Sequence, residues 1–177
     1  MPYARKLSQA FVALVTGAVL TVAPMTASAT ADSNGSAAHP EANCFRFDDL
    51  NEVVLSVGWY VNKGVGLTPV IGDIGYYTDD LYLPDGKKLG TVSAVVVVSY
   101  LRPKDDHMMI FLDETVTLPG GTVTDAGFVD DTTSLEGVTQ SIPVKTATGR
   151  YAGMSGARTY LIVSRTLAHS SLDLCRR

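Results

Sequence analysis

The feature that most constrains the fold of this chain is a series of β-branched and apolar runs that are broken by turns. Long strand-like runs occupy residues 93–100 (SAVVVVSY), 107–118 (HMMIFLDETVTL) and 157–167 (ARTYLIVSRTL). Turn sequences stand at 84–86 (PDG), 103–106 (PKDD) and 119–121 (PGG). No segment after residue 43 keeps an uninterrupted helical period over about three turns. The pattern predicts an all-β domain built as an antiparallel meander.

A meander of this length protects its edge strands best by closing on itself. We therefore expect residues 44–177 to form one domain, an eight-stranded antiparallel β-barrel of calycin-like topology. A barrel of about eight strands has an interior that side chains fill or that holds one small ligand. A β-sandwich is the alternative architecture.

Residues 1–29 predict a secretory signal peptide. Arg5 and Lys6 precede an apolar run at 10–23, and the small residues 27–29 (ASA) form a cleavage site. We expect export with cleavage near Ala29; an uncleaved membrane anchor is the alternative. Residues 30–43 are small and polar without periodicity, which predicts a flexible tail.

Charge and cysteine content narrow the possible partners. The leader holds two of the 14 basic residues and none of the 18 acidic ones, so the remaining 12 basic and 18 acidic residues give a net charge of −6. An acidic chain without a Lys/Arg cluster is not suited to nucleic acid. Cys44 and Cys175, near the two ends of an exported chain, predict a disulfide. Two isolated cysteines and three scattered histidines form no metal-ligand cluster, so no metal is expected.

Period-two alternation assigns side chains to the two faces of the strands. One face of the first long run carries Val92, Ala94, Val96, Val98 and Tyr100. In the run at 157–167, which we expect to be the last strand, Arg158, Tyr160 and Ile162 share a face. Glycines 149, 153 and 156 precede this run. Because a strand follows them and not a helix, they predict a sharp bend and close backbone contact, not a phosphate site.

Glu114 and Arg158 are the charged candidates for a functional site. Glu114 falls among Met108, Ile110, Leu112, Val116 and Leu118 on an otherwise apolar face. A carboxylate there is costly unless it is paired or protonated. Three interpretations of Glu114 are open: it forms a structural pair with Arg158, it lies exposed on the outer face, or it is a polar anchor at the end of an apolar pocket. The forked donors of Arg158 would suit an oxyanion.

Aromatic residues on separate candidate strands are candidates for a cavity wall. They are Tyr77, Tyr100, Phe128 and Tyr160. Filling of the core is the alternative role for each of them. The acidic pairs at 79–80 and 130–131 are adjacent on strands, so their side chains should point to opposite faces and not share a catalytic site.

The order of several motifs resembles a known family. Residues 71–91 (IGDIGYYTDDLYLPDGKKLGT) resemble the opening hairpin of the allene oxide cyclase barrel and dirigent-type proteins, and residues 146–160 (TATGRYAGMSGARTY) resemble their C-terminal signature. Within that group the chain is most similar to bacterial spirotetronate cyclases. The motifs that carry this likeness are SYLRPKDD, LDETVTLPGG, GFVDD and PVKTATGRYAGMSGARTYLI.

The resemblance implies an eight-stranded barrel, commonly dimeric, with a mostly apolar central pocket. Its pocket walls would correspond to Tyr77 in the second strand, Leu112 in the fourth, and Tyr160 and Ile162 in the last. It also implies an intramolecular [4+2] cycloaddition of a linear polyene polyketide of the tetronate type, which needs no cofactor. Arg158 and Tyr160 are the expected catalytic residues. Tyr77, Tyr100, Leu112, Glu114, Phe128 and Ile162 are the expected substrate-binding residues.

A function of a different class stays open beside the cyclase. The chain would then be an exported barrel that binds a lipid-like or phenolic ligand, or a dirigent-type auxiliary that steers the coupling of radicals made by another enzyme. A purely structural role is a further alternative, because a filled barrel would have a similar sequence.

Overall fold

A computed structural model of the chain describes residues 43–64 and 69–176. The predicted signal peptide and all but the last residue of the predicted tail lie outside these residues. No helix of the described part is long and apolar enough to cross a membrane.

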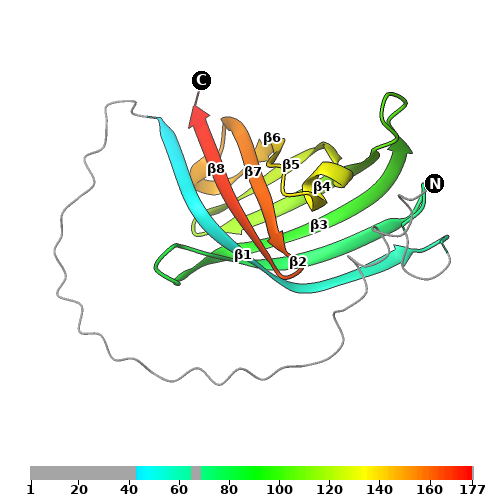
Figure 1. The fold of residues 1–177 in the computed structure, drawn as a ribbon. Helices are drawn as coiled ribbons and strands as arrows, with labels where there is room; N and C mark the ends of the chain where they lie inside the picture. Colours follow the sequence, from blue (N-terminus) through cyan, green and yellow to red (C-terminus); the bar gives the residue numbers. More distant parts are fainter. Residues whose placement is uncertain (1–42, 65–68, 177) are drawn as a thin grey trace, which may run out of the picture.

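The chain folds into a closed barrel of eight antiparallel strands, which confirms the predicted fold class over the sandwich alternative (Figure 1). The strands are β1 (Cys44–Val61), β2 (Ile74–Tyr82), β3 (Lys88–Leu101), β4 (Met108–Leu118), β5 (Gly121–Asp130), β6 (Gln140–Ala147), β7 (Met154–Ser164) and β8 (Leu167–Arg176). A short helix, α2 (Asp131–Leu135), follows β5, and a 3-10 turn, Gly149–Tyr151, precedes β7. Each strand pairs with its neighbour in sequence, and β8 pairs with β1 to close the barrel.

The run at 157–167 is not the last strand, as the sequence pattern had suggested. It contains most of β7 and the start of β8, with a tight turn at Arg165 and Thr166 between them. Within that turn the backbone N–H of Thr166 donates to Ser164 Oγ at 3.3 Å. The turn contains neither proline nor glycine, so composition alone does not mark it.

The predicted disulfide is present and joins the first strand of the barrel to the last. Cys44 and Cys175 are register partners of β1 and β8, 131 residues apart in sequence, and their sulfur atoms are bonded. Figure 1 shows the start of β1 beside the end of β8.

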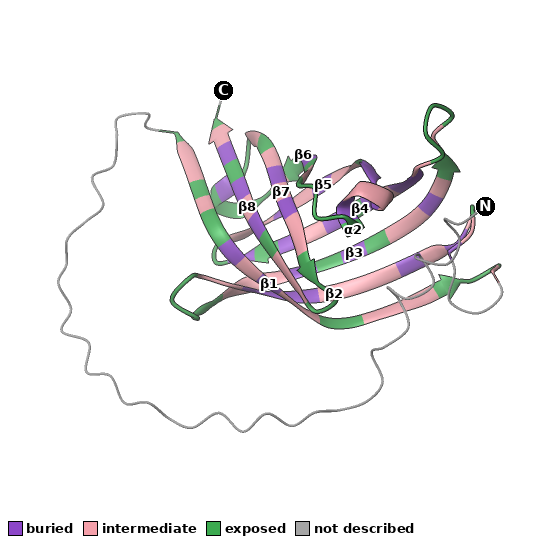
Figure 2. Cartoon of the chain, in the orientation of Figure 1, coloured by how far each residue is buried: buried purple, intermediate pink, exposed green. Residues whose placement is uncertain are grey.

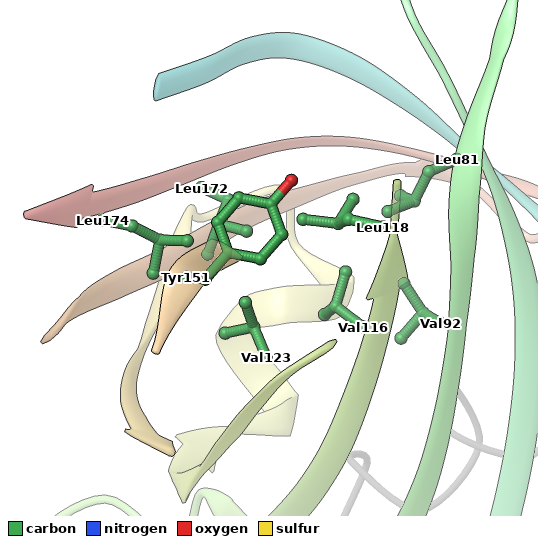
Figure 3. Close-up of a cluster of buried hydrophobic side chains, with 8 residues drawn as sticks. All are labelled: Leu81, Val92, Val116, Leu118, Val123, Tyr151, Leu172 and Leu174. Carbon is green, nitrogen blue, oxygen red and sulfur yellow. The ribbon is translucent and has the colours of Figure 1, made fainter. Parts of the chain in front are cut away.

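Inward-facing side chains form two apolar clusters, and the strands alternate between buried and exposed residues along their length (Figure 2). We call the cluster at the disulfide end the closed half. Its members are at most 5% exposed. They are Leu81, Val92, Val116, Leu118, Val123, Tyr151, Leu172 and Leu174, whose side chains converge in Figure 3.

The glycines before β7 allow the bend and close approach that the sequence predicts. Gly149 and Gly153 have φ of +59° and +76°, a conformation that other residues rarely adopt. A Cβ on Gly156 would stand 1.8 Å from the carbonyl oxygen of Asp173 on β8. These positions therefore require glycine because of backbone geometry.

Candidate functional site

A buried arginine between two glutamates lies at mid-height inside the barrel. Arg158 Nη1 donates to Glu114 Oε2 at 2.6 Å, and Arg158 Nη2 donates to Glu52 Oε2. The exposed fractions of Arg158, Glu114 and Glu52 are 2%, 0% and 4%. Alternation places Glu114 inward from β4 and Arg158 inward from β7, so the predicted pairing of the two is present and the exposed position for Glu114 is excluded.

Further inward-facing acids complete this layer. Asp79 lies on β2 next to Glu52, and Asp125 lies on β5 opposite Glu114 in the strand register. The phenol of Tyr77 on β2 donates to Glu114 Oε1. We call Glu52, Tyr77, Asp79, Glu114, Asp125 and Arg158 the central polar layer.

Burial and neighbouring charges set the protonation of the layer. Burial raises the pKa of Asp79 to about 8 and that of Asp125 to about 9, and the adjacent Glu52 and Glu114 add to these shifts. Burial would also raise the pKa of Glu114, but the Arg158 charge and the hydrogen bonds to its carboxylate lower it. At neutral pH two acids of the layer are therefore protonated, beside an ionised Glu114.

The second apolar cluster lies on the other side of the central polar layer, and we call it the mouth half. It contains Val98, Met108, Ile110, Leu112, Val129, Ile142 and Tyr160, with Trp59, Tyr77, Val96 and Ile162 packed against it. Several members keep some exposure, such as Met108 at 7%, Ile110 at 8% and Tyr160 at 9%. This half is therefore less tightly sealed than the closed half.

Four of the predicted pocket residues meet where the central polar layer borders the mouth half. Tyr77 packs against both apolar clusters, whereas Leu112, Tyr160 and Ile162 belong to the mouth half. The ring centroid of Tyr160 lies 5.6 Å from Cζ of Arg158. Burial raises the pKa of Tyr160, so its phenol keeps its proton, and the phenol hydrogen-bonds with Ser134 of α2.

Tyr100 and Phe128 lie on the outside of the barrel, so the prediction that they line its interior is wrong. Their exposed fractions are 41% and 55%, and their rings contact each other edge to face at 5.7 Å. A register irregularity between Val98 and Tyr100 in β3 reverses the alternation that the sequence pattern assumes. In β5, Val129 points inward, so its neighbour Phe128 points outward.

The sequence analysis gave no functional role to three of the layer's acids, Glu52, Asp79 and Asp125. Asp79 lies opposite the core residue Val92 in the register, whereas Asp80 makes an ion pair with Lys88 at 2.7 Å. Asp131 begins α2, so the second acidic pair does not lie on a single strand, contrary to the expectation. The inward position of Asp125 follows from alternation with Val123, a signal that was available in the sequence. Glu52 had no such signal, because β1 is irregular near it, with a register shift between Phe47 and Leu50.

A second polar cluster connects the β3–β4 hairpin with α2 at the mouth half. Asp130 accepts hydrogen bonds from Arg102 Nη2 at 2.6 Å and from the backbone N–H of Thr133 at 3.1 Å, and it lies 2.9 Å from His107 Nδ1. It thereby caps α2 and connects this helix to the β3–β4 hairpin at residues 102–107.

Surface pockets lie over the outer faces of the strands. One, of about 320 Å³, is lined by Tyr60, Tyr76, Thr78, Ser93, Val95 and Asp113 among others. Another, of about 200 Å³, is lined from β7 and β8 by residues that include Thr159 and His169. Within residues 43–64 and 69–176, no group of three or more His, Cys, Asp or Glu could hold a metal ion.

Comparison with solved structures gives two cyclases at 29% sequence identity. One is described as a nonspecific heme-binding cyclase that catalyses [4+2] cycloaddition during neoabyssomicin biosynthesis, with a TM-score of 0.67. The other is the Diels–Alderase AbmU from Streptomyces koyangensis, with a TM-score of 0.66. Each match covers 76% of this chain, which spans 65% and 64% of those two chains, slightly under two thirds of their length.

A more distant structure shares the fold alone. It is AbnU, described as an exo-specific intermolecular Diels–Alderase, with 21% identity, a TM-score of 0.66, and coverage of 74% of this chain and 96% of the other. Residues 55–172, which include the end of β1, all of β2 to β7 and the first part of β8, match the family described as the allene oxide cyclase barrel like domain. With a closed eight-stranded barrel and a family match over more than half of its length, the chain belongs to the allene oxide cyclase barrel-like family.

Proposed function

We propose that the protein is a cofactor-independent cyclase that catalyses an intramolecular [4+2] cycloaddition of a linear polyene polyketide of the tetronate type. The likeness to two [4+2] cyclases at 29% identity carries the proposal. The mouth half supports it, because an apolar cluster bordered by one polar layer is the surrounding that a long polyene with a single polar end needs.

The reaction requires little from the protein apart from shape. Diene and dienophile form two carbon–carbon bonds, no atom enters or leaves, and the product is an isomer of the substrate. Folding the flexible chain so that the reacting carbons meet can lower the barrier by several kcal/mol. Leu112, Ile162 and Trp59 would supply the walls that impose this shape.

Tyr160 is the best placed donor to a substrate carbonyl. Its phenol keeps its proton, it hydrogen-bonds with Ser134, which a substrate carbonyl would have to replace, and its side chain is 9% exposed in the less sealed half. Arg158 is 2% exposed, and two of its nitrogens already donate to glutamates. We therefore assign Tyr160 as the catalytic donor and Arg158 as a positioning residue.

The test is to incubate the purified protein with a linear polyene tetronate and to follow the appearance of a cyclised isomer of equal mass by chromatography and NMR. Tyr160→Phe should slow this reaction by about tenfold to a hundredfold, because a hydrogen bond to the developing charge is lost. Tyr100→Phe is the matched control on the outer surface and should react at the wild-type rate. Both variants should keep the circular dichroism of the barrel.

Equal rates for the two variants would remove Tyr160 from the mechanism. Binding of the polyene without any cyclised isomer would favour the alternative of a non-catalytic ligand-binding or dirigent-type barrel. Export and assembly as a homodimer stay predictions.

A further inference from the structure

The central polar layer holds more carboxyl groups than cations. Arg158 is its one cation, and Glu52, Asp79, Glu114 and Asp125 are its acids. The guanidinium is placed between the two glutamates and is therefore neutralised by them. The two aspartic acids are protonated at neutral pH, so they add no charge, and the layer offers no cation besides Arg158, which already donates to both glutamates.

Several buried polar atoms inside the barrel lack a hydrogen-bond partner of ordinary geometry within the described part of the chain. Asp79 Oδ1, both carboxyl oxygens of Asp125 and the hydroxyl of Ser170 on β8 make no hydrogen bond of ordinary geometry with the described residues. These three residues are at most 4% exposed. Asp79 and Asp125 interact with Glu52 and Glu114, so the hydroxyl of Ser170 is the group that a water molecule or a polar ligand group would satisfy.

The layer forms the floor of the mouth half. Tyr77 donates to Glu114 and also packs against the mouth-half cluster, and the Tyr160 ring lies beside Arg158. The polar end of a ligand that enters the mouth half therefore meets carboxyl groups and phenols, and it meets no free cation. In a medium of low dielectric constant, a negative charge placed there is repelled.

We propose that the barrel selects an uncharged polar head group and rejects an anionic one, with Glu52 and Glu114 as the specificity-determining residues. This inference rests on the proposed function, because it takes the mouth half as the binding site. It also narrows the substrate class. A free tetronic acid is a vinylogous carboxylic acid and ionises below neutral pH, so the barrel should take an O-substituted or otherwise uncharged tetronate.

Two linear polyenes that differ only in head-group charge provide the test. Parinaric acid and its primary amide share one fluorescent tetraene chain, and the acid is ionised near neutral pH. Titrated against the wild-type protein, the amide should bind at least about tenfold more tightly than the acid. The primary amine of the same chain should bind at least as tightly as the amide.

Variants then assign the selectivity to the layer. The double variant Glu52→Gln with Glu114→Gln removes the two carboxylates that pair with Arg158, so its preference for the amide over the acid should shrink. Asp113→Asn removes an exposed carboxylate from the outer face of β4 and should keep the wild-type ratio. Near-UV circular dichroism checks the fold of each variant, and if the double variant does not fold, the three probes on the wild-type protein decide the question.

The outcomes separate the two proposals. If the acid binds the wild-type protein as tightly as the amide, the charge selectivity is wrong while an apolar binding site remains. If none of the three probes binds, the mouth half is not a polyene site and the proposed function fails with it.

Discussion

At the scale of single residues, the central polar layer shows how one charged side chain depends on its neighbours. Arg158 is buried because two glutamates neutralise it, and Glu114 stays ionised because Arg158 and Tyr77 donate to it. Removing one partner of such a pair leaves the other as an uncompensated buried charge. Arg158→Ala should therefore destabilise the fold, and a loss of activity in that variant would not identify a catalytic role.

The raised pKa values of Asp79 and Asp125 predict a loss of stability at alkaline pH. In the unfolded chain these acids ionise near pH 4, whereas in the barrel they hold their protons up to about pH 8 and about pH 9. The folded state thus binds more protons between these limits. The stabilisation that comes from this proton binding is complete below about pH 4. It decreases as the pH rises and is lost once the pH exceeds the pKa values of the folded state.

Urea unfolding at a series of pH values measures this decline. The urea concentration at the unfolding midpoint should decrease as the pH is raised from about 6 to about 10. The variant Asp125→Asn, whose side chain cannot ionise, should show a smaller decrease. Asp113→Asn is the exposed control and should leave the slope unchanged. A midpoint for the wild-type protein that is constant across this range would contradict protonated acids in the layer.

At the scale of elements, the mouth half is bordered by two short segments that the barrel itself does not fix. The β3–β4 hairpin and α2 are held together through Asp130, which binds Arg102 and lies next to His107 while it caps the helix. Arg102 also makes two hydrogen bonds of 2.8 Å to Asp105 within the hairpin. These contacts determine how far the two segments lie apart.

Asp130→Ala should loosen both segments while the barrel stays closed. The loss of the helix cap and of a partly exposed charge pair should cost about 1–3 kcal/mol of unfolding free energy. Amide hydrogen exchange should become faster at residues 102–107 and 131–135 and remain unchanged in the closed half. Lys104→Ala, in an exposed position of the same hairpin, is the control. Exchange that rises equally throughout the barrel would show that Asp130 supports the whole fold instead.

At the scale of the whole molecule, closure depends on the pairing of the first strand with the last one. The strands β1 and β8 begin and end the described domain, and the Cys44–Cys175 disulfide joins them across 131 residues of sequence. A cross-link over a loop of this length restricts the unfolded chain strongly.

Replacing both cysteines by serine should lower the unfolding free energy by up to about 5 kcal/mol, the value that the chain-entropy model gives for such a loop. Urea unfolding of the double variant measures the change, and wild-type protein unfolded under reducing conditions should match it. The m-value should decrease when the cross-link is present, because the oxidised unfolded chain is more compact. Equal stability with and without the bond would mean that strand pairing alone closes the barrel.

The sequence by itself predicted the fold class, the turns with Pro or Gly and the disulfide, and it marked Glu114 as a carboxylate on an apolar face whose direction stayed open. These follow from local rules: alternation with period two, turn chemistry and the cost of a carboxylate on an apolar face. The interior positions of Leu112, Tyr160 and Ile162 were expected from the resemblance to the family, and the structure places all three in the mouth half.

Only the tertiary structure decided which residues meet inside the barrel. Glu52 and Arg158 are 106 residues apart, and their contact depends on the closure of β8 onto β1 and on the tilt of the strands. Tyr100 is turned outward by an irregularity in β3 that no residue type marks. Local patterns fix the face of each side chain, whereas closure and register decide its neighbours, and the chemistry of the central polar layer depends on those neighbours.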